Sequence, residues 1–99
     1  MAYRLTRDAE ADLDEVWSYI AQESRAPDIA RHLVESIAER FDLLSVHPRM
    51  GRTRSDLRRG LRSHPVGNYI IFYRIVGVDV VILRVLHGRR DIGALLRGR

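Results

Sequence analysis

The spacing of apolar residues changes once along this chain of 99 residues. Over residues 7–46 apolar side chains recur every three or four positions, a period that predicts helices with one buried face. Over residues 61–87 they form short, nearly continuous runs rich in Val, Ile, Tyr and Phe, which predict strands. Helices of this kind bury their apolar faces against a sheet, so we expect an α+β fold. The length allows one domain, residues 1–99.

Two helices are predicted, over about residues 7–22 and 27–46. Thr6 is a good N-cap for the first helix. Pro27 suits the first turn of the second helix, which should end before Pro48. The connection between the helices is only about four residues, and this predicts an antiparallel helical hairpin.

The first helix carries one apolar stripe and several acidic residues. The stripe consists of Ala9, Leu13, Val16, Trp17 and Ile20. Trp17 is therefore expected in the core. Glu10, Asp12, Asp14 and Glu15 are expected on the other sides of the helix.

Four strands are predicted, over residues 3–5, 61–66, 69–76 and 78–87. Gly67-Asn68 has the composition of a two-residue hairpin turn. The last strand is apolar along most of its length, so we expect it to be central and covered on both faces. The order is β-α-α-β-β-β. Its simplest packing places the helical hairpin on one face of a small antiparallel sheet, and leaves the other face, or one end of it, to arginines and a histidine.

Charge is distributed unevenly along the chain. The net charge is +4, and all 17 basic residues are arginine. Ten of the 13 acidic residues lie in positions 1–42, whereas twelve of the arginines lie in positions 49–99. This asymmetry predicts a positive surface for an acidic partner or a nucleic acid. Residues 47–60 read as a basic loop, in which we expect Gly51 to supply a turn conformation that other residues avoid.

Several classes of protein are excluded by composition. The chain has no cysteine, which excludes disulfide scaffolds, cysteine-ligated metals and thiol nucleophiles. The four histidines are scattered, and we expect neither a metal nor another cofactor. The N-terminus lacks the pattern of a signal peptide, and the longest apolar runs are too short to span a membrane. We therefore expect a cytoplasmic protein without a membrane partner.

Three charged or titratable residues of the strands have two interpretations each. Arg74 and Arg84 interrupt apolar runs, where an unpaired charge is costly. Each either pairs with an acid of the helical hairpin or projects from the open face of the sheet. His87 either hydrogen-bonds to nearby backbone or contacts a partner. The C-terminal arginines form either a solvated tail or a docking surface for nucleic acid or an acidic protein; they are Arg89, Arg90, Arg97 and Arg99.

Four segments carry a resemblance to a known family: Tyr3–Trp17, His47–Arg52, Arg62–Arg74 and Ile82–Asp91. Together with the helices between them they cover nearly the whole chain. In this order and spacing they resemble the RelE/ParE superfamily of type II toxin–antitoxin toxins, and within it the ParE branch. The resemblance implies the β-α-α-β-β-β fold already predicted from the apolar spacing.

The resemblance also implies a function. ParE-like toxins are linked to inhibition of DNA gyrase, and a ParD antitoxin holds them inactive by wrapping an acidic and apolar C-terminal segment around them. We therefore expect a non-catalytic inhibitor of gyrase, and direct binding to nucleic acid stays an open question. The expected antitoxin contacts are Leu13, Trp17, Ile20, Arg62, Arg84 and Arg89. The expected target contacts are Arg74, His87 and Arg90.

Two alternatives remain. The RelE branch cleaves messenger RNA on the ribosome, and it usually places an arginine directly after the tyrosine of the hairpin strand and a tyrosine after the last strand. Here Ile70 follows Tyr69, and Gly88 follows His87. The groups available to replace the missing cation and acid are Arg62, Arg74, Arg84 and His87. The other alternative is an inactive toxin that only binds its antitoxin.

Overall fold

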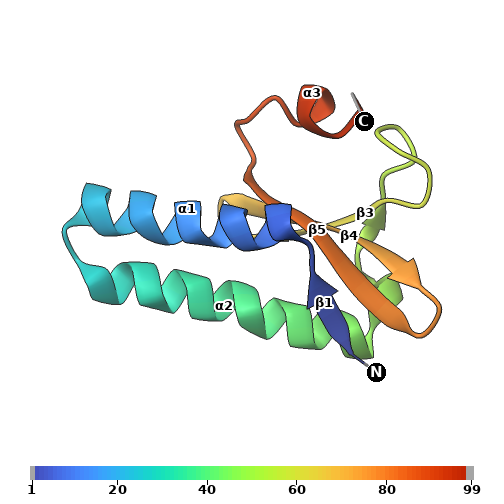
Figure 1. The fold of residues 1–99 in the computed structure, drawn as a ribbon, viewed down its shortest axis with the longest axis horizontal. Coiled ribbons are helices and arrows are strands. Elements are labelled where there is room, and N and C mark those ends of the chain that lie inside the picture. Colours follow the sequence, from blue (N-terminus) through green and yellow to red (C-terminus); the bar gives the residue numbers. More distant parts are fainter. Residues whose placement is uncertain (1, 98–99) are drawn as a thin grey trace.

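The computed structural model describes residues 2–97, with side chains through Leu96. In chain order the elements are β1 (Tyr3–Leu5), α1 (Arg7–Ser24), α2 (Pro27–Val46), η1 (Pro48–Met50, a 3-10 turn), β2 (Arg52–Thr53), β3 (Arg62–Val66), β4 (Tyr69–Val76), β5 (Asp79–His87) and α3 (Ile92–Arg97). Helices α1 and α2 lie side by side as the predicted hairpin (Figure 1). The predicted fold class is confirmed. None of the helices in the described residues is both long and apolar enough to cross a membrane.

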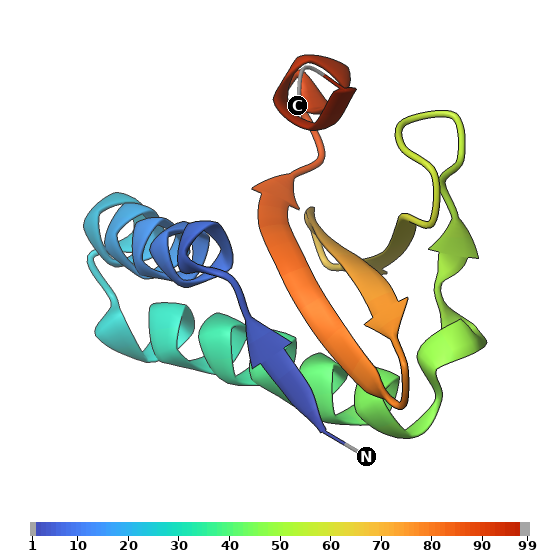
Figure 2. The same cartoon turned by 45° about the vertical axis from the view of Figure 1, so that its right-hand side comes forward.

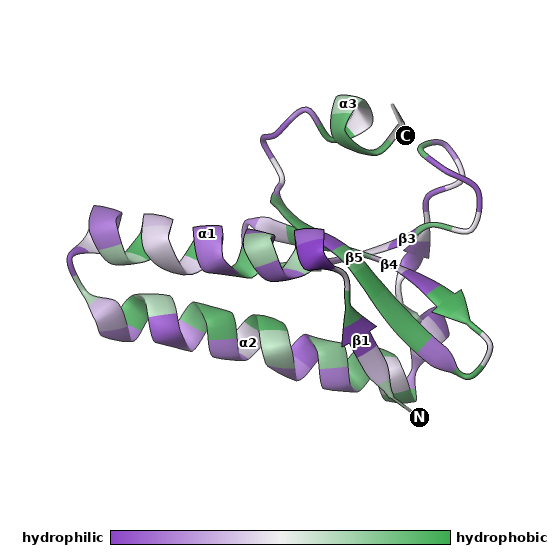
Figure 3. Cartoon of the chain, viewed as in Figure 1, coloured by the Kyte–Doolittle hydropathy of each residue, from purple (hydrophilic) through white to green (hydrophobic). Residues whose placement is uncertain are grey.

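The sheet has five strands in the order β1-β5-β4-β3-β2. The neighbours β5, β4 and β3 are antiparallel, as predicted, and β2 is antiparallel to β3. Strand β1 pairs with β5 in parallel, so the sheet is mixed. Strand β5 therefore has a neighbour on each side, which agrees with its continuous apolar sequence (Figure 3). The short strand β2, inside the predicted basic loop, was not expected from the sequence, because two residues carry no recognisable period.

The main core lies between the helical hairpin and one face of the sheet. Its largest members include Phe41 and Ile37 of α2, Tyr73 and Ile71 of β4, and Ile82 of β5. All five are almost completely buried. Burial of large apolar side chains of this kind contributes about 1.5–3 kcal/mol each, so this layer is the main stabilising contact of the fold.

A smaller core lies on the opposite face of the sheet. It consists of Leu57, Leu61, Phe72, Leu86 and Leu96. Helix α3 lies beyond the end of β5, away from α1 and α2, and the loop before β3 returns toward it (Figure 2). The predicted basic loop is therefore anchored by two leucines rather than fully solvated. The hairpin thus covers one face of the sheet, and α3 with this loop covers part of the other.

Two predictions on α1 were wrong. Trp17 is 41% exposed, and Asp12 is buried at 4% exposure. The buried residues of α1 are Ala9, Asp12 and Val16, so the stripe is centred about one residue earlier than expected. At about 100° per residue, Trp17 is rotated from Val16 toward solvent. The N-cap prediction is confirmed, because the Thr6 side chain accepts a hydrogen bond from the Ala9 N–H.

The explanation expected for Gly51 was also wrong. Its backbone is extended, with φ −72° and ψ 153°, a conformation that other residues adopt. A Cβ at this position would lie 2.2 Å from the hydroxyl oxygen of Tyr73. Glycine is needed because the backbone approaches this ring closely.

Tyr73 anchors the start of the basic loop through its hydroxyl group. The Gly51 N–H donates to Tyr73 Oη at 2.8 Å, and the hydroxyl donates to the Pro48 carbonyl at 2.6 Å. Arg62 Nη1 donates to the Gly51 carbonyl at 2.7 Å. Burial raises the pKa of the Tyr73 hydroxyl, so the neutral donor form is favoured. The loop therefore leaves the sheet from a fixed position.

Candidate functional site

A groove of about 560 Å³ runs between α1 and the ends of β4 and β5. It is lined by Asp12, Glu15, Val16, Tyr19, Tyr69, Val85, His87, Arg89 and Arg90. The groove exists because β1 has only three residues and pairs with Val80–Ile82 alone. The remainder of β5 therefore has no neighbouring strand on that side within the described chain.

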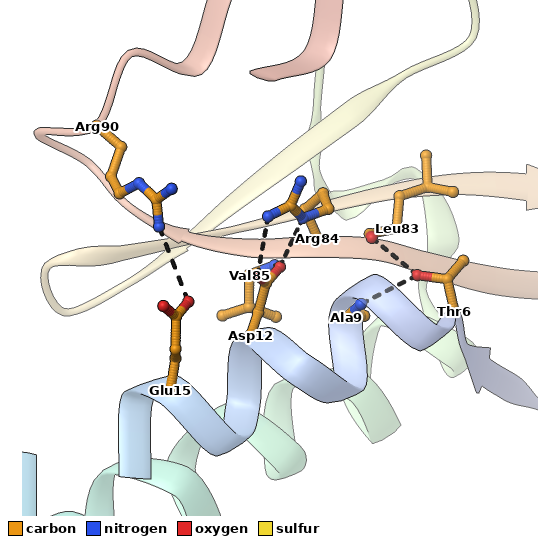
Figure 4. Close-up of polar contacts among 8 residues, drawn as sticks. All are labelled: Thr6, Ala9, Asp12, Glu15, Leu83, Arg84, Val85 and Arg90. Carbon is orange, nitrogen blue, oxygen red and sulfur yellow. Dashed lines mark hydrogen bonds and ion pairs between the residues drawn. The ribbon is translucent and has the colours of Figure 1, made fainter. Parts of the chain in front are cut away.

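Helix α1 satisfies the first part of this uncovered edge. The Thr6 N–H donates to the Ile82 carbonyl at 3.0 Å. The Thr6 hydroxyl donates to the Leu83 carbonyl at 2.9 Å, as Figure 4 shows. Further along, the Val85 N–H donates to Asp12 Oδ2 at 2.9 Å. The N-cap residue Thr6 and the Asp12 side chain of α1 thus replace a neighbouring strand, which fixes the helix against β5.

Asp12 also forms the most buried ion pair that the structure describes. Arg84 donates from Nε to Oδ2 at 2.8 Å and from Nη2 to Oδ1 at 3.0 Å, a bidentate geometry (Figure 4). The side chains of Arg84 and Asp12 are 17% and 4% exposed. The hydrogen bonds that Arg84 donates to Asp12 raise the pKa of its guanidinium further above its ordinary value. Of the two interpretations of Arg84, pairing with an acid of the hairpin is confirmed.

A register shift between Phe72 and Tyr73 gives Arg84 its position. Phe72 pairs with Arg84 and Tyr73 pairs with Ile82, so Leu83 is the extra residue of a bulge in β5. A bulge of this kind re-aims the side chains beside it. Arg84 can therefore reach the helix side of the sheet although its register partner Phe72 belongs to the opposite core.

His87 and Tyr69 form the far end of the groove. Their rings meet edge to face, with centroids 5.2 Å apart and planes at 81°. His87 Nδ1 accepts a hydrogen bond from the Arg89 N–H at 3.1 Å, so the expected hydrogen bond to nearby backbone is confirmed. Burial, followed by the charge of Tyr19, raises the pKa of the Tyr69 hydroxyl. The neutral form of the Tyr69 phenol is therefore favoured.

The rim of the groove is charged and the floor is apolar. Val16, Tyr69 and Val85 are buried, whereas Arg89 and Arg90 are exposed. Arg90 Nη1 lies 3.9 Å from Glu15 Oε2, a long and exposed pair that is worth little (Figure 4). The arrangement suits an apolar segment that carries carboxylates along one side.

The structure brings only part of the predicted site together. His87, Arg89 and Arg90 share the groove. Leu13 and Ile20 are partly buried against the main core, and Trp17 is exposed on the same helix. The side chain of Arg97, and Arg99 entirely, lie outside the described residues.

The other predicted arginines lie elsewhere. Arg62 is held by the Gly51 carbonyl at the far side of the sheet. Arg74 is exposed, and its register partner on β5 is Val81. Val81 lies six residues before His87 on that strand. This separation along the strand is about 20 Å at the usual rise per residue. The groups named as substitutes for ribonuclease residues therefore do not converge on one position.

Sequence reasoning missed Asp12 and Tyr19 as groove residues. A signal for Asp12 was present: it lies three residues after Ala9 and four before Val16, the spacing of a shared face. A carboxylate on that face, together with Arg84 inside an apolar strand, indicates a buried pair. For Tyr19, which is 57% exposed, no sequence signal separates a groove residue from an ordinary surface residue.

A family model, described as the ParE toxin of the type II toxin–antitoxin system parDE, matches residues 3–92. Toxin ParE1 of Caulobacter vibrioides is 44% identical over 88 residues, which cover 86% of each chain. Toxin ParE3 of the same organism is 43% identical over 91 residues, covering 92% of this chain and 90% of that protein. Toxin ParE1 of Mycobacterium tuberculosis is 31% identical over 91 residues, covering 91% of this chain and 92% of that protein.

Two solved structures are also similar. A chain of the chromosomal ParDE toxin–antitoxin system from P. aeruginosa matches with a TM-score of 0.76 and 26% identity, covering 88% of this chain and 95% of that one. A chain of the toxin–antitoxin complex RelBE2 from Mycobacterium tuberculosis matches with a TM-score of 0.58 and 35% identity, covering 87% of this chain and 95% of that one.

Proposed function

Since this chain belongs to the ParE family, the toxins of type II ParDE toxin–antitoxin systems, we propose that it inhibits DNA gyrase and that a ParD-like antitoxin neutralises it. Inhibition is by binding and not by catalysis. The observation that supports this part is the dispersal of the ionisable side chains. Arg62, Arg74 and Arg84 lie at separate places, and Arg84 is already paired with Asp12. A target of this kind places the protein in the cytoplasm.

The groove beside α1 is the proposed antitoxin site. It combines an apolar floor, an arginine rim and a stretch of β5 with no neighbouring strand, so an extended or helical segment with apolar and acidic residues can bury its apolar side there. Leu13, Trp17 and Ile20 of α1 remain proposed antitoxin contacts outside the groove; Trp17 is exposed, whereas Leu13 and Ile20 are partly buried against the main core. Arg89, at the rim of the groove, is the proposed partner of an antitoxin carboxylate. Arg84 contributes indirectly, by holding Asp12, which lines the groove on its α1 side.

A double-mutant cycle tests the electrostatic part of this site. Arg89→Gln is combined with neutralisation of each acidic residue in the antitoxin segment, and affinities and association rates are measured by surface plasmon resonance at several salt concentrations. A rim charge acts mainly on the association rate and on its salt dependence, so both should fall in Arg89→Gln. Arg31→Gln on α2 is the matched control, since Arg31 is exposed and lies on the other helix of the hairpin. Zero coupling at every acidic position contradicts the proposed contact.

Gyrase binding is tested separately with purified components. The toxin is immobilised and gyrase is passed over it, with and without an equimolar amount of the antitoxin. We expect capture of gyrase by the toxin alone and loss of capture in the complex. Absence of capture by folded toxin contradicts the proposed target.

A ribosome-dependent ribonuclease is the second candidate. The similarity to a chain of a RelBE2 complex, at 35% identity, is the observation that favours it. This function predicts cleaved messenger RNA in cells that express the toxin, and loss of cleavage in His87→Ala. Intact messenger RNA in growth-arrested cells excludes it. Normal growth of cells that contain the folded chain points instead to a toxin that only binds its antitoxin.

A further inference from the structure

Arginines line the sheet face opposite the helical hairpin, where α3 does not reach. Arg4 of β1 pairs in register with Val81 of β5, which in turn pairs with Arg74 of β4. Register partners in neighbouring strands project to the same face, and neighbouring residues in one strand project to opposite faces. Val80 and Ile82 belong to the main core under the hairpin, so Val81 and both arginines point away from it.

The basic face continues toward β2 and the loop before β3. Arg52 pairs with Ser63, and Ser63 pairs with Phe72 of the smaller core, so Arg52 also lies on this face. The loop returns close to Arg74, because a Cβ built on Gly60 lies 4.0 Å from Arg74 Nε. Arg59, next to Gly60, extends the row. All four arginines that define the basic face are exposed: Arg4, Arg52, Arg59 and Arg74.

Little negative charge offsets these arginines. Asp79 of β5 projects to the same face as Val81, two residues later, but among the described residues it forms no ion pair with these arginines. Between positions 43 and 78 the one acidic residue is Asp56. It is held by Arg54, whose Nε and Nη2 each lie 3.2 Å from a carboxylate oxygen, and these hydrogen bonds lower the pKa of Asp56. Within the part of the chain that the structure describes, no carboxylate pairs with Arg4, Arg59 or Arg74. The guanidinium groups are therefore available to an external anion.

We infer that this basic face binds the phosphate backbone of duplex DNA. Guanidinium groups donate in pairs to phosphate oxygens, and several of them on one surface match the spaced charges of a duplex. The role of such binding in toxin action rests on the proposed gyrase target, because gyrase works on DNA; the binding itself does not depend on gyrase.

The side chains on this face favour a duplex over a single strand. Single-stranded nucleic acids are held by aromatic side chains on which bases stack. Among the described residues, the strongly exposed aromatic side chains are those of Trp17 and Tyr19. Both belong to α1, on the other side of the sheet. Phe72, on the side of the basic face, is fully buried. An acidic protein partner is also less well matched, because the cores of protein interfaces are apolar and, on the described strands, the exposed apolar area beside these arginines is confined to Val76 at the end of β4. Here Val81, between Arg4 and Arg74, is buried.

The test is fluorescence anisotropy of a labelled 20-base-pair duplex titrated with the full chain at several salt concentrations. If three phosphates are neutralised, the slope of log K against log salt is about −2.7, an affinity loss of about 40-fold between 50 and 200 mM salt. In Arg59→Gln/Arg74→Gln the slope should become shallower by about 1.8. Arg31→Gln/Arg40→Gln, which removes the same charge from exposed positions of α2, should keep the slope of the unmodified chain.

Four results overturn the inference. Equal weakening in both double variants, each with an unchanged circular dichroism spectrum, indicates a response to net charge alone. Tighter binding of a single strand of the same length assigns the face to another nucleic acid. Absence of DNA binding, with salt-sensitive capture of gyrase that Arg59→Gln/Arg74→Gln abolishes, assigns it to an acidic protein surface. Failure of DNA binding with gyrase inhibition intact removes only this inference, and DNA binding without gyrase inhibition removes only the proposed function.

Discussion

Replacing Asp12 with alanine removes the carboxylate that holds both Arg84 and the Val85 N–H. Asp12 is 4% exposed and Arg84 is 17% exposed, so the guanidinium left behind is mostly desolvated and has no described partner of equal geometry. Breaking a buried pair from one side costs about 3–5 kcal/mol, and the residual exposure of Arg84 places this case near 3 kcal/mol. For a domain of this size the melting temperature should fall by about 12–24 °C.

The assay is urea unfolding followed by circular dichroism. Asp14→Ala is the control, because Asp14 is exposed on the same helix and carries the same charge. In Asp12→Leu/Arg84→Met the loss should be recovered only in part, since replacing both partners of a buried ion pair by apolar residues is close to neutral, whereas the buried Val85 N–H stays without an acceptor. A loss below about 1 kcal/mol in Asp12→Ala, or additive losses in the double variant, refutes the assignment of this pair as the element that fixes α1 to β5.

Three further predictions concern the rest of the sheet. Gly51→Ala should destabilise the fold by about 1–3 kcal/mol in urea unfolding, because its Cβ would overlap the Tyr73 hydroxyl; an unchanged midpoint contradicts the close approach. Tyr73→Phe should lower the free energy of unfolding by about 1–3 kcal/mol, because the Gly51 N–H loses its acceptor. The pKa of Tyr73 is raised in the folded chain, so above pH 10.0 this tyrosine deprotonates only in the unfolded chain and the fold loses stability. Tyr73→Phe should make that loss smaller. Burial, and then the charge of Arg40, lower the pKa of His64 below its usual 6.5. The stability of the fold should therefore fall as the pH drops below 6.5. In His64→Gln the melting temperature should depend less on pH in this range.

The elements of the fold were accessible from local signals. Pro27 and Pro48 bracket α2, and the Gly67-Asn68 pair marks the turn between β3 and β4. Such signals depend on residues close in sequence, which is why the bounds of α2 and β4 were predicted correctly. The partner of β1 was not accessible, because the pairing of Tyr3–Leu5 with Val80–Ile82 spans almost the whole chain.

The site was less accessible, because its properties arise from contacts across the fold. Trp17 was expected in the core, since periodicity locates a stripe only to within about one residue, whereas burial changes over that distance. The reason for glycine at position 51 depends on Tyr73, 22 residues later. Arginines 74 and 84 looked equivalent in sequence, and only the bulge in β5 directs Arg84 to Asp12 while Arg74 stays exposed.

The central claim, inhibition of gyrase by binding, is tested most directly by DNA supercoiling with purified gyrase and increasing amounts of this protein. Relaxed DNA and trapped double-strand breaks are scored in the same reactions, and equimolar ParD-like antitoxin serves as the control. We expect loss of supercoiling, accumulation of breaks, and reversal of both when the antitoxin is added before the toxin. Unchanged supercoiling in the presence of correctly folded protein contradicts the claim.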